Sequence, residues 1–164
     1  MNQVVVKQEK SGYQIVEAYK SLRTNLQFCG EDKKVIAITS CTPNEGKSSV
    51  SMQLGISLAE IGKRVILIDA DLRKSVLLGR TKTEKSVRGL AHFLSGQASL
   101  EDVICATNIK NFYMIYSGPF PPNPAELLGS RQFKDMIRVV RDVYDYIIID
   151  TPPLGRVIDC AVVA

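Results

Sequence analysis

Apolar residues are concentrated in four short runs along the chain. The runs read KVIAIT, RVILID, NFYMIY and DYIIID, at residues 34–39, 64–69, 111–116 and 145–150. They hardly alternate between apolar and polar positions, which is typical of strands buried on both faces of a parallel sheet. We therefore predict a strand at each of the four ranges.

Before the first of these runs, apolar residues recur with the spacing of a helix. Ile15, Tyr19, Leu22 and Leu26 recur at intervals of four, three and four residues, which predicts an amphipathic helix within residues 12–28. The domain should bury that apolar face.

Three more helices are expected. Residues 48–62 have a helical pattern that ends at Gly62, a suitable C-terminal cap, and a short helix is predicted around residues 90–94. After a proline-rich turn at 118–128, the last helix has one apolar face, made of Phe133, Met136, Ile137 and Val140. Strands alternating with helices predict a single three-layer α/β domain with a mostly parallel sheet over residues 1–164.

Composition narrows the possible functions. The chain is 45% apolar and 23% charged, and its formal charge of +4 is scattered and not interleaved with aromatic residues, so we expect no nucleic-acid binding. The four cysteines are far apart, which fits reduced thiols, and Cys41 is expected to be a small packing residue. With His92 as the only histidine, a histidine metal cluster is excluded. No apolar run approaches the roughly 20 residues of a membrane helix, so a cytoplasmic protein is expected.

The stretch AITSCTPNEGKSSV, residues 37–50, resembles a phosphate-binding loop that lacks its first glycine. The motif requires glycine where this chain has Cys41, yet the loop follows a predicted strand and precedes a predicted helix, as the motif demands. Gly46 would let backbone N–H groups approach phosphate oxygens, and Lys47 would contact the β- and γ-phosphates. The expected nucleotide-binding residues are Pro43, Asn44, Glu45, Gly46, Lys47, Ser48 and Ser49.

Three aspartates follow buried strands. Asp69 and Asp71 end one strand and Asp150 ends another, and ligands of open α/β sheets bind at the carboxyl ends of strands. We therefore expect the three acids to converge beside the loop, where Ser48, Asp71 and Asp150 would hold Mg²⁺. The alternative is that Asp69 and Asp150 only cap turns.

At these motifs the sequence resembles the bacterial tyrosine kinases (BY-kinases) of capsule and exopolysaccharide synthesis, P-loop proteins with variant Walker motifs. The resemblance covers residues 17–164, and includes a stretch similar to G-x-x-P-P-N-P-x-E-L-L-x-S at residues 118–130. Four motifs are matched, by Ser40, Pro43 and Glu45–Ser48; by Asp69, Asp71 and Arg73; by Asp150–Pro153 with Asp159; and by Glu17, Lys20 and Arg23 in an oligomerisation helix.

The resemblance implies a P-loop NTPase-like fold and an ATP- and Mg²⁺-dependent protein-tyrosine kinase. Lys47, Asp69, Asp71 and Asp150 would form the catalytic set, with Asp69 accepting the proton of the tyrosine hydroxyl. It also implies a ring-like homo-oligomer and a membrane-anchored polysaccharide co-polymerase as activator, which would recruit this cytoplasmic protein to the inner face of the cell membrane.

Two departures qualify the resemblance. Lys20 replaces an arginine and lacks its bidentate geometry, which should weaken ring assembly. The family continues with further strands and a tyrosine-rich tail, so we expect a fold truncated at its C-terminus. The tyrosines that are present are expected to be structural: Tyr13, Tyr19, Tyr113, Tyr116, Tyr144 and Tyr146.

Two rival functions remain open at this point. Par- and Min-type ATPases share the fold, but they have a signature lysine at the place of Thr42. A truncated, non-catalytic interaction module would use the helix of residues 12–28 to join an oligomer.

Overall fold

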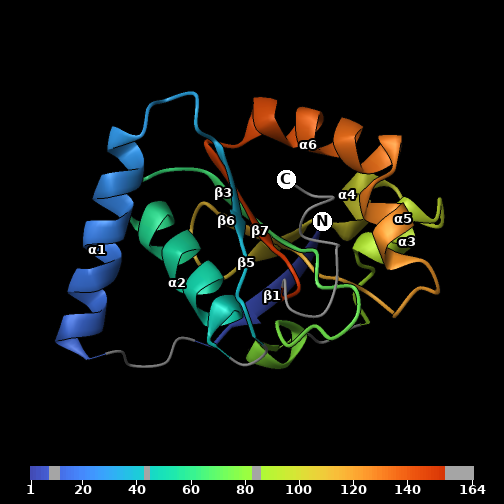
Figure 1. Ribbon diagram of the computed structural model, residues 1–164, viewed down its shortest axis with the longest axis horizontal. Coiled ribbons are helices and arrows are strands. Elements are labelled where there is room, and N and C mark those ends of the chain that lie inside the picture. The colour runs from blue at the N-terminus through green and yellow to red at the C-terminus, as the bar shows by residue number, and fades with distance from the viewer. Residues whose placement is uncertain (8–11, 43–44, 83–85, 154–164) are drawn as a thin grey trace.

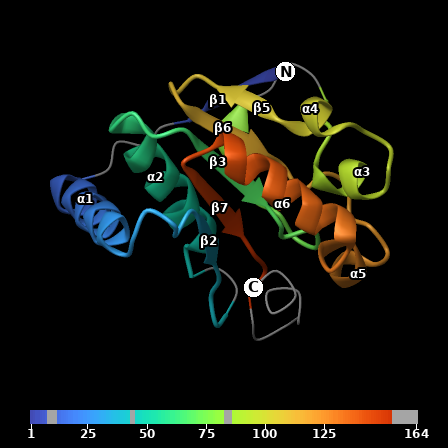
Figure 2. The same cartoon turned by 90° about the horizontal axis from the view of Figure 1, so that it is seen from above.

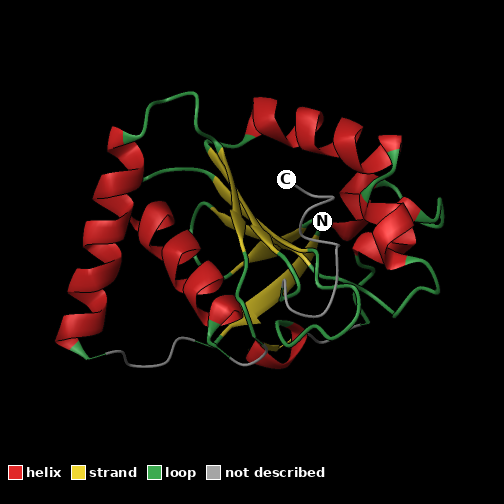
Figure 3. Cartoon of the chain, in the orientation of Figure 1, coloured by secondary structure: helices red, strands yellow, loops and turns green. Residues whose placement is uncertain are grey.

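The computed structural model describes residues 1–7, 12–42, 45–82 and 86–153. It has a mixed α/β architecture in which helices cover both faces of one sheet (Figure 1, Figure 3). The strands are β1 (Asn2–Val6), β2 (Val35–Ile38), β3 (Val65–Asp69), β4 (Thr81–Lys82), β5 (Cys105–Thr107), β6 (Phe112–Ile115) and β7 (Tyr146–Asp150). The helices are α1 (Tyr13–Phe28), α2 (Lys47–Glu60), the 3₁₀ turn η1 (Leu78–Arg80), α3 (Leu90–Leu94), α4 (Leu100–Val103), α5 (Pro124–Leu128) and α6 (Arg131–Val143).

The described strands form a seven-stranded sheet in the order β2-β7-β3-β6-β5-β1-β4. The four predicted strands are its parallel half, β2-β7-β3-β6. Beyond them, β5 is antiparallel to β6, β1 is parallel to β5, and β4 is antiparallel to β1. The prediction of only four strands is therefore wrong, because β1, β4 and β5 are too short or too mixed in polarity to stand out.

Each face of the sheet has its own apolar core. In β3, Ile66 and Ile68 pack with residues of α3 and α6, whereas Val65 and Leu67 pack with residues of α2. Figure 2 shows the corresponding layers, with α1 and α2 on one side of the sheet and α3 to α6 on the other. Every residue of β3 and β7 is buried, as their uninterrupted apolar sequences predict.

Gly55 lets α2 lie close against the sheet. A Cβ atom at this position would come within 2.5 Å of the Phe112 ring on β6, which is too short for a real contact. The absent side chain thus fixes the position of α2, the helix that begins at the phosphate-binding loop.

The apolar face expected of α1 is only partly buried. Tyr19 and Leu26 pack against the α2-side core, but Ile15 and Leu22 are 51% and 38% exposed. The prediction that all four residues are buried is therefore wrong. The reason is that α1 lies along the outer side of α2 (Figure 2) and contacts the rest of the domain mainly through that helix.

Candidate nucleotide-binding site

The carboxyl ends of three neighbouring strands bring the predicted site residues together. Asp150 ends β7, and it is the register partner of Ile38 at the end of β2 and of Asp69 at the end of β3. The loop that leaves β2 leads into α2, which begins at Lys47. The predicted convergence of the acids beside the loop is confirmed.

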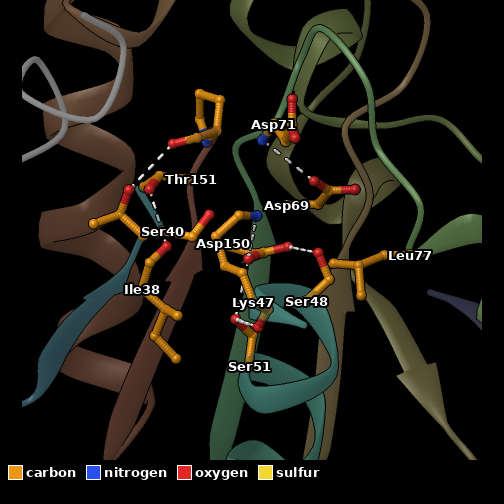
Figure 4. A network of polar contacts seen from close by, with 12 residues as sticks. Ile38, Ser40, Lys47, Ser48, Ser51, Asp69, Asp71, Leu77, Asp150 and Thr151 are labelled. Atoms are coloured by element: carbon orange, nitrogen blue, oxygen red, sulfur yellow. Dashed lines mark hydrogen bonds and ion pairs between the residues drawn. The ribbon is translucent and has the colours of Figure 1, made fainter. Parts of the chain in front are cut away.

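Asp150 is the centre of the polar network in Figure 4. Its side chain is 1% exposed, and its Oδ1 atom forms an ion pair of 2.8 Å with the Lys47 ammonium group. The Ser48 hydroxyl donates to Oδ2 at 2.6 Å, and the Ser51 hydroxyl lies 3.1 Å from Oδ1. Because one buried carboxylate has three donors from α2, it fixes the first turn of that helix against β7.

Asp69 and Asp71 lie on the neighbouring strand end and are also buried. Asp69 accepts hydrogen bonds from the Asp71 backbone N–H and from the Ser75 hydroxyl. Burial foremost, and then the negative charges of Asp150 and Asp71, raise the pKa of Asp69 to about 7, although the Ser75 hydrogen bond opposes this.

Turn capping is one role of these acids. Asp71 Oδ1 accepts from the Lys74 backbone N–H at 3.0 Å, and Asp69 Oδ1 accepts from the Asp71 N–H at 3.3 Å. Asp150 has no such turn contact among its hydrogen bonds within the described chain. The turn-capping alternative therefore describes Asp69 and not Asp150.

Glu45 shapes the loop in which the first motif glycine is missing. Its carboxylate accepts from the Cys41 backbone N–H at 3.1 Å and from the Thr42 hydroxyl at 2.6 Å. The Thr42 hydrogen bond is the main reason that the pKa of Glu45 is lowered. This carboxylate thus links Cys41 and Thr42 to the residue before Gly46, and Cys41 itself has no positive φ, so its backbone does not need glycine.

Gly46 is left-handed at the start of α2. Its φ of 83° is a conformation that residues with a Cβ atom rarely adopt, and it is the N-cap of the helix. Pro43 and Asn44, which were also predicted to bind nucleotide, lie outside the described residues.

The donor set suits a hard divalent cation together with a bound phosphate. The described residues contain no group of three or more His, Cys, Asp or Glu side chains that could hold a metal alone. Ser48 Oγ and the Asp150 carboxylate are nevertheless adjacent oxygen ligands, with Asp71 following the next strand. Mg²⁺ in proteins is usually bound through one or two carboxylates and substrate phosphates, so the residues fit this ion.

Sequence reasoning missed several polar residues of the site. Ser51 is fully buried and contacts both Asp150 and the Lys47 carbonyl oxygen, and Ser75 covers Asp69. The spacing of four residues between Lys47 and Ser51 on one helix was the signal for the former. Nothing local marks Ser75, since its contact depends on the path of the loop after β3.

Within the described residues, Cys41 and His92 are not part of the polar network around Asp150. Cys41 is exposed, so its prediction as a packing residue is wrong. His92 lies in α3, where its Nδ1 atom accepts from the Gly89 backbone N–H at 3.1 Å. This contact gives His92 a structural role at the start of α3.

The predicted oligomerisation residues do not form one free surface. Lys20 and Glu17 form an ion pair of 2.8 Å within α1. Arg23 instead donates to the backbone oxygen of Ser57 on α2 at 2.8 Å and to its hydroxyl at 3.2 Å. Arg23 therefore lies on the side of α1 that faces the domain, and it is not free to meet a neighbouring subunit as a residue of the predicted oligomerisation helix would be.

A strand, a phosphate-type loop, a helix and a neighbouring strand-end aspartate together define a P-loop nucleotide-binding protein. The AAA domain family model matches residues 33–164, so the chain belongs to that family. The chain is 47% identical over 148 residues to tyrosine-protein kinase CpsD of Streptococcus agalactiae. This alignment covers 90% of the present chain and 65% of CpsD. Within the family, the chain is a member of the bacterial tyrosine kinases.

Solved structures agree with this assignment. The kinase domain of the Escherichia coli tyrosine kinase ETK superposes with a TM-score of 0.85 at 37% identity, over 90% of this chain and 58% of that one. The septum site-determining protein MinD from Pyrococcus horikoshii, complexed with Mg-ADP, superposes with a TM-score of 0.64 at 28% identity. The match covers 79% of this chain and 53% of MinD. The chain thus resembles the kinase more than the Min protein, and it spans slightly less than two thirds of the length of CpsD.

Proposed function

We propose that this chain is the nucleotide-binding part of an ATP-dependent protein-tyrosine kinase that acts in capsular or exopolysaccharide synthesis. The observation that supports it most is the convergence of Lys47, Ser48 and Asp150 at one sheet edge, next to Asp69 and Asp71. The relatives named tyrosine-protein kinases support the choice of reaction.

Lys47 would exchange partners when a nucleotide binds. Its ammonium group is held by Asp150 in a pair whose side chains are 7% and 1% exposed. A β- or γ-phosphate offers the ammonium group a second anionic partner at the first turn of α2, where unpaired N–H groups favour anions. Asp150 would then be available with Ser48 and Asp71 to hold Mg²⁺, which would neutralise phosphate charge.

Asp69 is suited to accept the proton of a tyrosine hydroxyl. A general base works best with a pKa near the operating pH, and in the nucleotide-free protein burial raises the pKa of Asp69 to about 7. Because the Ser75 hydroxyl is bound to it, that hydroxyl must move aside or relay the proton before a substrate is deprotonated.

Mg-ADP binding tests the site. Mg-ADP should raise the melting temperature of the protein by mass action, and Lys47→Met should abolish the rise. Lys134→Met, at an exposed lysine of α6, is the matched control and should leave the rise unchanged. An equal rise in Lys47→Met and the wild type would refute the site.

The reaction itself is tested with the whole gene product and labelled ATP. Label on tyrosine supports the kinase. Label released only as free phosphate would support instead a Par- or Min-like ATPase, the function of the more distant structural neighbours.

Self-association through α1 is the second proposal. Ile15 and Leu22 leave apolar area exposed on this helix, and the Glu17–Lys20 pair lies beside it. Lys20→Arg should strengthen association in light scattering at low salt, because arginine pairs with carboxylates through two hydrogen bonds. A monomer at all concentrations in both proteins would argue against it.

The remaining proposals follow from the resemblance to the BY-kinases of capsule and exopolysaccharide synthesis. The activator would be a membrane-anchored polysaccharide co-polymerase, and the kinase would be cytoplasmic and recruited through it to the inner face of the membrane. No helix in the described part of the chain is long and apolar enough to cross a bilayer. Co-sedimentation with membranes that contain or lack the activator tests this recruitment.

A further inference from the structure

Arg80 contacts the first turn of α2 from a segment outside the loop and strand-end motifs. It is the last residue of η1, and its Nη1 atom donates a hydrogen bond to Ser49 Oγ at 2.5 Å. Ser49 directly follows Lys47 and Ser48 in α2, so this contact lies one residue from the two side chains that bind Asp150.

The direction of this hydrogen bond leaves the Ser49 hydroxyl available as a donor to another group. A guanidinium group has donors only, so the Ser49 oxygen is the acceptor and its own proton must be donated elsewhere. No described residue accepts that proton. Since the helix N-terminus faces the proposed nucleotide, a phosphate oxygen is the acceptor that the geometry favours.

The positive charge of Arg80 lies beside the N-terminal end of α2. The N-terminal end of a helix has a partial positive charge, so a cation beside it is unfavourable unless an anion compensates both. Within the described chain, no carboxylate forms an ion pair with Arg80. A bound phosphate group would provide the missing negative charge.

Two backbone hydrogen bonds fix the main chain at Arg80. Its N–H donates to the carbonyl oxygen of Leu77, a fully buried core residue, and its own carbonyl accepts from the Lys7 N–H next to β1. The next residue, Thr81, is bound by the hydroxyl of the buried Tyr116. The arginine therefore extends from a fixed base, which suits a positioning residue.

We propose that Arg80 is a positioning residue of the nucleotide site, which orients the Ser49 hydroxyl as a donor toward a phosphate of the bound nucleotide. This inference rests on the proposed function, because it requires a nucleotide at α2. It adds a residue from the segment after β3, outside the loop and strand-end motifs.

The test is Mg-ADP affinity, measured by titration calorimetry, in Arg80→Gln, Ser49→Ala, Ser49→Thr and the double variant Arg80→Gln/Ser49→Ala. Loss of one charge-assisted interaction should weaken binding roughly tenfold in Arg80→Gln and in Ser49→Ala. Ser49→Thr keeps the hydroxyl and should bind within about twofold of the wild type. Arg138→Gln, at an exposed arginine of α6, is the control and should bind normally.

The double variant separates positioning from an independent contribution. If Arg80 acts through Ser49, the double variant loses no more affinity than the weaker-binding single variant. A loss of about a hundredfold, the product of two tenfold effects, would overturn the positioning role. In the whole gene product, Arg80→Gln should raise KM for ATP and change kcat little, and unfolding of the nucleotide-free variant should be unchanged.

Two outcomes distinguish this inference from the proposed function. If the wild type binds no Mg-ADP, the nucleotide site itself is refuted and the role of Arg80 with it. If the wild type binds and Arg80→Gln binds equally well, only the role of Arg80 is refuted.

Discussion

Removing the Lys47 ammonium group should leave a buried negative charge without its ion-pair partner. Asp150 is 1% exposed and would keep only the hydroxyl groups of Ser48 and Ser51. Breaking a buried ion pair from one side costs about 3–5 kcal/mol of folding stability. Lys47→Met should therefore strongly lower the free energy of unfolding of the nucleotide-free protein.

In Lys47→Met, the Asp150 carboxyl group can become neutral by binding a proton. The free energy of that protonation is an upper limit to the loss of stability, and it depends on pH. Protonating a carboxyl group whose ordinary pKa is about 3.9 costs about 4 kcal/mol at pH 7 and about 1.5 kcal/mol at pH 5. The folded variant binds this proton more readily than the unfolded chain, so its stability rises as the pH falls. The loss should be about 3–4 kcal/mol at pH 7 and at most about 1.5 kcal/mol at pH 5.

Urea unfolding followed by circular dichroism measures both values. In Lys47→Met/Asp150→Asn the buried charge is gone, so most of the stability lost at pH 7 should return. Lys134→Met controls for the loss of a lysine on the surface. Equal losses at both pH values, or a double variant no more stable than Lys47→Met, would refute the reasoning.

Three further predictions concern single residues. Asp69→Asn should stabilise the nucleotide-free protein above pH 7, because burial raises the pKa of Asp69 to about 7 and makes its ionised form unfavourable. The stability advantage of the variant over the wild type should shrink as the pH falls below 7. A difference in melting temperature between the two proteins that is constant from pH 5 to 8 would contradict this. Gly46→Ala should lower stability by about 1 kcal/mol and weaken Mg-ADP binding, because its φ of 83° strains any residue with a Cβ atom; unchanged urea unfolding and binding would speak against it. If the kinase phosphorylates tyrosines within this chain, mass spectrometry should find the phosphate on Tyr13, which is 80% exposed, whereas phosphate on the buried Tyr116 would show that the described fold had opened.

The sequence by itself determined the class of fold and the centre of the site. Four uninterrupted apolar runs predicted the parallel half of the sheet, because a strand covered by helices on both faces must be apolar throughout. Asp69, Asp71 and Asp150 could be placed together for a similar reason, since parallel strands all end at the same edge. Both inferences use regularities that every parallel α/β domain shares.

The tertiary structure alone decided the contacts between distant segments. Short strands such as β1 gain their stability from pairing with partners about 100 residues away, which no local pattern records. Arg23 faces α2 and not a neighbouring subunit, and Arg80 reaches Ser49 across 31 positions of sequence. A side chain's partner depends on where the chain returns in space, so the periodicity of one helix could not reveal that Arg23 is bound within its own domain.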